Sequence, residues 1–363
     1  MITKEKISPL QLGILIVGFN LGDAVLVSPA KGAFQDSWLS IIIAWMGSYF
    51  LVGTYVYISR LYPNMTLIEI LKSAFGKIMG TFIGILYVWY FIHISALVYR
   101  SFGEYIVTVN YPETPRIFIS IVLMLITVYA LKSGLEVIGR TGELTFVLIP
   151  VTIALLSVLL IEFMDIKNLQ PFLERGVTPV IKTSFALLTF PFGESIVFMM
   201  LFPFLNDSKK IWKTTYISLT LAGFLLFYIT LRNMMILGPN MIGSVLFPGH
   251  LVASLLPGAV LDPFLSITLL TLGGFQSLVC AYAAILGITQ LANLDDYKPI
   301  VFPVMIIIVS LSNWLYKDIT SMIRVAKDIY PFYAIPFQML IPAILLIVSV
   351  IKQRKSTAKK KPN

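Results

Sequence analysis

Ten long segments, almost free of charged side chains, constrain the fold of this chain more than any other feature of its sequence. They cover residues 7–30 with Asp23 inside, 37–59, 78–99, 117–131, 144–161, 183–206 with Glu194 inside, 214–231, 263–294, 299–316 and 329–351. A helix needs about 20 apolar residues to cross a bilayer, and somewhat fewer where its flanks reach the interface. The pattern predicts an all-α polytopic membrane protein with ten transmembrane helices.

The composition supports this prediction and excludes several classes of protein. Apolar side chains make up 58% of the 363 residues and charged ones only 12%, whereas soluble domains carry about 25% charged residues. A water-soluble enzyme, a nucleic-acid-binding domain and a disulfide-stapled secreted domain are therefore excluded. The single cysteine, Cys280, lies in an apolar segment and cannot form an intrachain disulfide.

One further apolar stretch, residues 233–261, is long enough to cross a membrane but is interrupted by prolines. Pro239, Pro248 and Pro257 recur there together with several glycines. A lipid-facing helix would lose a backbone hydrogen bond at each proline, because proline has no N–H group. We therefore predict an external or re-entrant segment packed on protein, and the count stays at ten spans.

The positions of lysine and arginine predict the orientation. With ten spans and an inner N-terminus, 17 of the 27 basic residues fall in cytoplasmic segments, and such an excess is typical of the cytoplasmic side. Six of these lie in residues 352–363, which we interpret as a basic cytoplasmic tail. Both termini are thus expected in the cytoplasm, and residues 1–363 are expected to form a single transmembrane domain.

Two of the ten spans contain a glycine followed directly by an acid. Gly22 precedes Asp23 in span one, and Gly193 precedes Glu194 in span six, 171 residues further along the chain. Five spans precede the sixth and five begin with it, so the two halves must have opposite topology. This is the pattern of a five-plus-five inverted repeat in which broken helices one and six meet at the middle of the bilayer. The first repeat would cover about residues 8–162 and the second about 180–351.

A helix break within a membrane exposes polar backbone groups that a ligand can use. Each unsatisfied group costs several kcal/mol, so a break persists only where protein, water or a ligand supplies partners. The N-terminal end of a half-helix suits a carboxylate, and the carbonyl end suits an ammonium group or a cation. A zwitterionic amino acid matches both ends. We therefore predict a small-molecule site at the two Gly-acid breaks rather than glycines that serve only helix packing.

The two acids, Asp23 and Glu194, leave three roles open. Either could bind an amine of the ligand, carry a coupling proton, or pair with a cation at membrane depth such as Arg100 or Arg232. Arg100 also lies four residues before Glu104 on one helix face. We expect these two side chains to form a structural ion pair.

No sequence pattern indicates a metal, a cofactor or catalysis. His93 lies in an aromatic stretch of span three and is interpreted as a packing residue, and His250 has no second histidine or acid at ligand spacing. The serine-nucleophile elbow, the zinc-protease motif and the phosphate-binding loop are all missing from the sequence. We therefore expect a protein that is not an enzyme and needs no cofactor or metal.

The order of several short motifs resembles that of the B subunits of bacterial spore germination (nutrient germinant) receptors, a branch of the amino acid/polyamine/organocation transporter superfamily. The motifs are GFNLGDA at 18–24, QDSW at 35–38, YRSF at 99–102, GLEVIGR at 134–140, NLQPF at 168–172 and FPFGE at 190–194. The resemblance implies a transporter-like fold whose central pocket senses a nutrient, commonly an amino acid. It also implies a subunit that works beside a larger A-type membrane subunit and a C-type lipoprotein subunit in the spore inner membrane.

By resemblance, the pocket draws on spans one, three, six and eight. The implied ligand contacts are Asn20, Gly22, Asp23, Tyr90, Ile94, Phe192, Gly193, Glu194, Gln276 and Cys280. Asp23 departs from the family, in which we expect a small residue after the glycine, and this leaves the charge of the ligand open. The favoured hypothesis is a germinant-sensing receptor subunit that signals to its partner subunits and has no nucleic-acid partner. The alternative is a secondary active amino acid transporter coupled to protons or cations.

Overall fold

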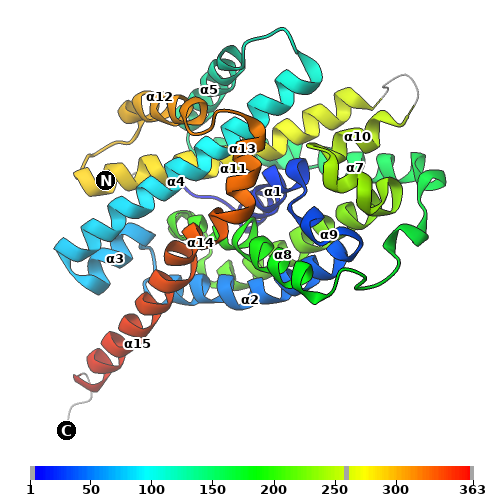
Figure 1. The fold of residues 1–363 in the computed structure, drawn as a ribbon. Helices are drawn as coiled ribbons and strands as arrows, with labels where there is room; N and C mark the ends of the chain where they lie inside the picture. The colour runs from blue at the N-terminus through cyan, green and yellow to red at the C-terminus, as the bar shows by residue number, and fades with distance from the viewer. Residues whose placement is uncertain (1–4, 257–260, 360–363) are drawn as a thin grey trace.

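The computed structural model describes residues 5–256 and 261–359, and this part of the chain is almost entirely helical (Figure 1). Its α-helices are α1 (Pro9–Val27), α2 (Ser37–Leu61), α3 (Leu67–Phe75), α4 (Lys77–Tyr105), α5 (Arg116–Ser133), α6 (Leu135–Thr145), α7 (Leu148–Leu159), α8 (Val177–Thr189), α9 (Ile211–Ser244), α10 (Pro248–Ser254), α11 (Asp262–Ala292), α12 (Lys298–Trp314), α13 (Ile319–Asp328), α14 (Tyr330–Ile335) and α15 (Ile341–Lys359). The 3-10 and π-helical segments are η1 (Pro29–Asp36), η2 (Ile106–Asn110), η3 (Ile161–Phe163), η4 (Ile166–Leu169), η5 (Phe192–Met200), η6 (Phe202–Phe204), η7 (Ser208–Lys210) and η9 (Pro336–Leu340).

The number of membrane spans agrees with the sequence. Nine helical stretches of the described chain are long and apolar enough to cross a membrane, and α12 with α13 adds a tenth that bends by 97°. Each of the ten predicted segments overlaps one of these stretches. The prediction of an all-α protein with ten spans is therefore confirmed.

Spans one, six and eight form the centre of the bundle. In their apolar windows 83%, 78% and 78% of the residues are buried, against 28% and 22% in spans four and five. The first span packs against α9 and α11, and α4 lies along α11. Both spans with a Gly-acid pair are thus shielded from lipid, as a broken helix requires.

The first span begins at a cap that the sequence encodes. The N–H of Gln11 donates to Oγ of Ser8 at 3.1 Å, and the N–H of Ser8 donates to Oε1 of Gln11 at 2.8 Å. Pro9 stands at the first helical position, where the missing N–H costs no hydrogen bond. This capping box fixes the residue at which span one enters the bundle.

The segment before this cap is tied to the end of span six. The N–H of Ile7 donates to the carbonyl of Phe204 at 2.9 Å, and the N–H of Asn206 donates to the carbonyl of Ile7 at 3.0 Å. Nζ of Lys6 donates to the carbonyl of Pro203, 197 residues away, at 3.1 Å. The start of one broken span and the end of the other therefore meet on the same side of the bundle.

Both predicted breaks are present. Within α1 the backbone of Gly22 has φ −7° and ψ −114°, far from helical values, which glycine tolerates because it has no Cβ. In span six, α8 ends at Thr189, and Pro191 precedes η5. Proline cannot donate the next helical hydrogen bond, so the helix stops there.

Span seven differs from the prediction. The helix α9 does not end near Leu231 but continues to Ser244 across a kink at Gly238, where φ is +72°. Pro239 follows the kink at a position where a helix can resume without that N–H. The first part of the 233–261 stretch therefore belongs to span seven. Beyond it, the described residues form only α10, whose seven residues are too few to cross a membrane, so the prediction that this stretch adds no span is confirmed.

Span nine agrees with the predicted segment 299–316 and corresponds to α12. It ends at Trp314, and the chain then turns by 97° into α13. The carboxylate of Asp318 accepts the N–H of Ser321 at 2.7 Å and so caps the start of α13. A polar capping residue directly after the apolar run thus starts a new helix in a new direction.

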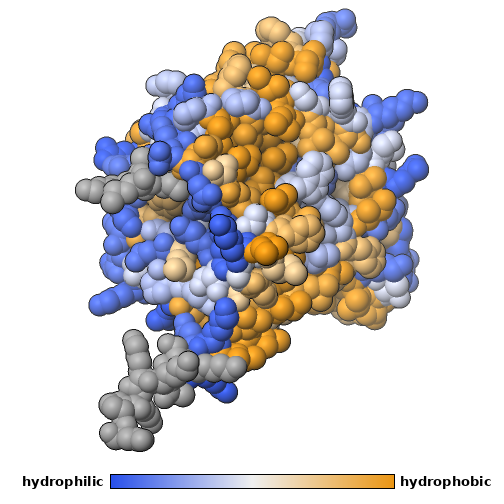
Figure 2. All heavy atoms as spheres, turned by 90° about the vertical axis from the view of Figure 1, so that its left-hand side faces the viewer, coloured by the Kyte–Doolittle hydropathy of each residue, from blue (hydrophilic) through white to orange (hydrophobic). Residues whose placement is uncertain are grey.

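The surface agrees with insertion into a membrane. Figure 2 shows a broad continuous area of apolar residues with hydrophilic residues on either side of it. In Figure 1 α15 and α3 lie on the same side of the molecule, and α10 lies on the opposite side. The predicted basic tail, 352–363, lies partly outside the described residues. Its first residue continues α15, and Nζ of Lys352 donates to the carbonyl of Ser73 at 3.0 Å.

Candidate functional site

A side chain from span eight occupies the first break. The N–H of Asp23, just beyond the Gly22 kink, donates to Oε1 of Gln276 at 2.7 Å. A Cβ at Gly22 would lie 2.1 Å from the same oxygen, which no real Cβ could do. Any side chain at this position would displace Gln276, because α1 and α11 meet there.

The carboxylate of Asp23 is almost fully buried, with 7% of the residue exposed. The hydroxyl of Ser101, on α4, donates to its Oδ2 at 2.9 Å. Within the described part of the chain, no group donates a hydrogen bond to the other oxygen, Oδ1. Buried polar atoms of native proteins usually have a partner. The first break therefore holds a free acceptor.

The carboxylate of Glu194 lies at the second break and is reached from two other spans. Its Oε1 accepts the hydroxyl of Tyr330, and its Oε2 accepts Nε2 of Gln276 at 3.1 Å. The carboxamide of Gln276 therefore joins the two breaks, with its oxygen on Asp23 and its nitrogen on Glu194. Two regions that are 171 residues apart in sequence, counted between Gly22 and Gly193, form one site.

A second glutamine fills the space beside the second glycine. Oε1 of Gln338 would lie 2.1 Å from a Cβ at Gly193. Its Nε2 donates to the hydroxyl of Tyr90 at 2.6 Å and to the carbonyl of Thr189 at 2.9 Å. The hydroxyls of Tyr90 and Tyr330 lie 3.2 Å apart and connect this glutamine to Glu194. The two breaks thus share one hydrogen-bond network.

A third contact links the two broken spans directly. Nδ2 of Asn20 lies 3.2 Å from Oγ of Ser195 and also donates to the carbonyl of Ile16 at 2.9 Å. Asn20 lies two residues before the first glycine, and Ser195 two residues after the second. The side chains around the breaks therefore hold spans one and six against each other.

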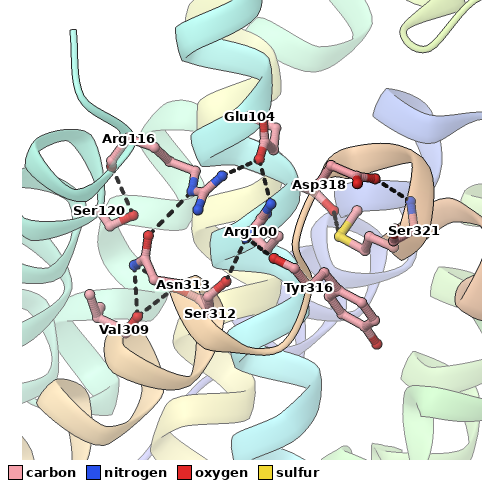
Figure 3. A network of polar contacts seen from close by, with 12 residues as sticks. Arg100, Glu104, Arg116, Ser120, Val309, Ser312, Asn313, Tyr316, Asp318 and Ser321 are labelled. Atoms are coloured by element: carbon pink, nitrogen blue, oxygen red, sulfur yellow. Dashed lines mark hydrogen bonds and ion pairs between the residues drawn. The ribbon is translucent and has the colours of Figure 1, made fainter.

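Arg100 does not neutralise either acid of the site (Figure 3). Its Nη2 lies 2.8 Å from Oε1 of Glu104, and its Nη1 donates to the carbonyl of Tyr316 at 2.8 Å. Arg116 approaches the same Glu104. The predicted ion pair between Arg100 and Glu104 is confirmed, and the cluster fastens the end of α12 to α4.

Arg232 also has its partners elsewhere. Its Nη2 and Nε donate to Oδ1 of Asn233 at 2.9 and 3.2 Å, and its Nη1 donates to Oγ of Ser157 at 3.5 Å. The possibility that one of these two arginines pairs with Asp23 or Glu194 is therefore wrong for this structure. The hydrogen-bond donors that reach the two carboxylates, in the part of the chain described, are all neutral.

The structure brings most of the ten predicted contact residues together. Seven lie at the breaks or in the network between them: Asn20, Gly22, Asp23, Tyr90, Gly193, Glu194 and Gln276. Ile94, Phe192 and Cys280 are buried on the same elements. His93 stacks on Trp89 at 6.2 Å between ring centroids, in agreement with a packing residue.

Sequence reasoning missed several residues of the network. They are Tyr55, Ser101, Ser195, Tyr330 and Gln338. Tyr55 donates its hydroxyl to the carbonyl of Gln338 at 2.7 Å. One signal could have indicated the last two, because Tyr330 and Gln338 are polar residues in the otherwise apolar span ten.

The comparisons with known proteins agree with this geometry. A family model described as spore germination protein matches residues 6–322. The chain belongs to the spore germination protein family. Among the relatives of this chain, spore germination protein KB of Bacillus subtilis (strain 168) is 30% identical over an alignment of 362 positions, which covers 97% of this chain and 96% of the relative. Spore germination protein YndE of the same organism is 27% identical over 79% of this chain and 81% of the relative.

Comparison with a solved structure shows the fold of this chain. MhsT, crystallised in complex with L-phenylalanine, matches 94% of this chain and 88% of its own with a TM-score of 0.66 and 10% sequence identity. MhsT has the LeuT fold, and that fold is built from inverted-topology repeats with discontinuous helices. The predicted five-plus-five inverted repeat is thereby confirmed. Family and fold together indicate a receptor B-type or permease-like role in spore germination, in an integral multi-pass membrane protein.

Proposed function

We propose that this chain is the germinant-sensing membrane subunit of a spore nutrient receptor. It binds a small nutrient, in the first instance an amino acid, between the two helix breaks and signals to its partner subunits to start germination. The proposal rests on the observation that both breaks share one hydrogen-bond network. This network contains the backbone N–H of Asp23 and the carboxylates of Asp23 and Glu194. An amino acid has the complementary charges.

The chemistry of the site suggests how the ligand lies. The carboxylate of an amino acid fits the N–H of Asp23 at the first break, where the half-helix begins. Its ammonium group fits the carboxylate of Glu194 and Oδ1 of Asp23, which has no other donor among the described residues. The rest of the ligand would then contact the side chains of Phe192, Ile94 and Cys280, which are buried on the same elements.

Signalling requires that the ligand bind one conformation better than another. In the proposed receptor, closure of the breaks around the nutrient alters the surface that this subunit presents to an A-type membrane subunit and a C-type lipoprotein. The complex is placed in the spore inner membrane with both termini of this chain in the cytoplasm. The family membership and the excess of basic residues in the predicted inner segments support this placement.

The test uses spores in which this chain is deleted and then restored as wild type or as a variant. Each strain is exposed to single nutrients and to mixtures, and the loss of optical density reports germination. Gly22→Trp should abolish the response while the protein remains present in the membrane, because even a Cβ at this position collides with Gln276. The matched control is Gly274→Trp on α11, since a Cβ there meets no heavy atom within 4 Å.

A response of Gly22→Trp spores at wild-type nutrient concentrations would reject the proposed site. The rival function, a coupled amino acid transporter, shares the fold and is separated by a second measurement. The purified chain alone, reconstituted in proteoliposomes, should show no concentrative uptake of amino acids driven by a proton or sodium gradient. Strong coupled uptake under these conditions would favour the transporter.

A further inference from the structure

The carboxamide of Gln276 makes the two contacts that the proposed ligand would make. Its oxygen accepts the N–H of Asp23 at 2.7 Å, and its nitrogen donates to Oε2 of Glu194 at 3.1 Å. The side chain is completely buried. One group thus supplies an acceptor to the first break and a donor to the second, as the carboxylate and the ammonium group of an amino acid do.

We propose that Gln276 is a built-in surrogate for the nutrient, which competes with an amino acid for the N–H of Asp23 and the carboxylate of Glu194. This inference rests on the proposed function, because it concerns the same site. Asp23 and Glu194 remain hydrogen-bonded while the glutamine is in place, so the breaks are stable without a ligand. An amino acid binds when the glutamine side chain rotates away from both partners.

The second glutamine shows that a buried glutamine at a break need not be a surrogate. Gln338 also lies against a glycine, but its Nε2 donates to the hydroxyl of Tyr90 and to the carbonyl of Thr189. It contacts neither of the two carboxylates and no N–H of the break. Gln338 therefore fills the space beside Gly193 and hydrogen-bonds the end of α8. Gln276 instead occupies the polar groups that a ligand would use.

The surrogate sets the nutrient concentration at which the subunit responds. A ligand that can bind only while the competing side chain is away shows an apparent affinity reduced by the fraction of time for which the site is open. Asp23 adds to the driving force for exchange, because Oδ1 accepts nothing from the described residues and can accept the incoming ammonium group. The nutrient thus gains one hydrogen bond that the glutamine does not make.

The experiment compares Gln276→Ala with Gln290→Ala. Both residues lie on α11, but Gln290 accepts the hydroxyl of Thr66 at 2.7 Å and lies more than three turns from the breaks. Spores with either variant are titrated with an equimolar mixture of the twenty protein L-amino acids. We expect the half-saturating concentration to fall roughly tenfold for Gln276→Ala, as for a site that is open about a tenth of the time in the wild type, and to stay at the wild-type value for Gln290→Ala.

A second measurement does not depend on germination. Cys280 is the only cysteine of the chain, is buried, and lies one helical turn from Gln276. In the purified full chain in lipid nanodiscs, 2-aminoethyl methanethiosulfonate should modify Cys280 faster in Gln276→Ala than in the wild type. The amino acid mixture should slow this reaction when it is applied without cysteine, whose free thiol would consume the reagent.

The outcomes separate the two proposals. A higher half-saturating concentration in Gln276→Ala would make Gln276 a direct ligand contact and overturn the surrogate. An unchanged rate of Cys280 modification would also overturn it, because the glutamine would then not close the site. The proposed function fails in a different way, namely when Gly22→Trp spores respond like the wild type.

Discussion

Neutral donors, rather than cations, stabilise the two carboxylates at the centre of the molecule. Ser101 donates to Asp23, and Tyr330 and Gln276 donate to Glu194. Acids at membrane depth are costly and are usually functional. Since the nearby arginines are committed to Glu104 and Asn233, the proposed site takes its positive charge from a ligand or a proton.

Tyr330→Phe tests the contribution of a single donor. The variant removes a hydroxyl from buried Glu194 and leaves Gln276 as its donor from the described residues. We expect a loss of about 1–3 kcal/mol in stability, as for a buried polar group that loses its partner, and a shift in the half-saturating nutrient concentration. Thermal unfolding in nanodiscs and spore titration measure the two effects.

The control for this prediction is Tyr99→Phe. Tyr99 donates its hydroxyl to Oγ1 of Thr127 at 2.6 Å, away from both breaks. The loss in stability should be about 0.5–1.5 kcal/mol, with no change in the nutrient titration. Equal titration curves for Tyr330→Phe and the wild type would show that Tyr330 only stabilises the fold.

At the level of helices, the junction between α12 and α13 depends on one buried ion pair. Arg100 reaches two carbonyl groups at the end of α12, Ser312 and Tyr316, while its charge is balanced by Glu104 (Figure 3). Oγ of Ser101, the next residue, lies 4.0 Å from Sδ of Met322 on α13 and donates to Asp23. The ion-pair cluster and the candidate site are therefore connected through neighbouring residues of α4.

Glu104→Gln should destabilise the protein strongly. The side chain of Arg100 is 0% exposed and that of Glu104 14%, and the loss of one partner from a buried ion pair costs about 3–5 kcal/mol. The matched control is Glu136→Gln, which breaks an exposed pair with Arg140, also four residues apart, and should cost under about 1 kcal/mol. Similar melting temperatures for the two variants would contradict the structural role of Arg100.

At the level of the whole molecule, the ten spans predict which loops face each side of the membrane. In a Cys280→Ala background, a cysteine at Glu113, which lies between α4 and α5, should react with a membrane-impermeant maleimide in intact cells. A cysteine at Ser208, between η6 and α9, should react only after permeabilisation. Both positions are exposed, so the reverse pattern would mean that the orientation inferred from lysine and arginine is wrong.

The sequence was sufficient to predict the spans and the breaks, because both depend on local patterns. Apolar runs set the spans, and Gly22 and Gly193 beside acids indicated where the helices are interrupted. Gln276 was found through the family resemblance. Tyr330 and Gln338 were not found. They stand out as polar residues of span ten, but the sequence does not show which groups they contact. Their contacts join positions more than 130 residues apart.

The bend after α12 could not be predicted for a related reason. The predicted span ended at residue 316, and its hydropathy did not indicate that Asp318 caps a further helix, which is turned by 97° from α12. The same applies to α9, in which Gly238 and Pro239 kink the helix without ending it. Hydropathy indicates whether a segment lies in lipid or in water. The direction of the helix that the segment forms depends on its caps and tertiary contacts.

The β-bridge between Ile7 and Leu205 gives the two repeats a common joint. Because backbone hydrogen bonds fasten the start of span one to the end of span six, neither broken helix can tilt at that end without the other. We then expect most of the motion in the half of each helix that lies beyond its glycine, away from this joint. That half contains Asp23 in span one and Thr189 in span six. The two broken spans are thus joined at one end, and we expect them to move apart or together only at the other end.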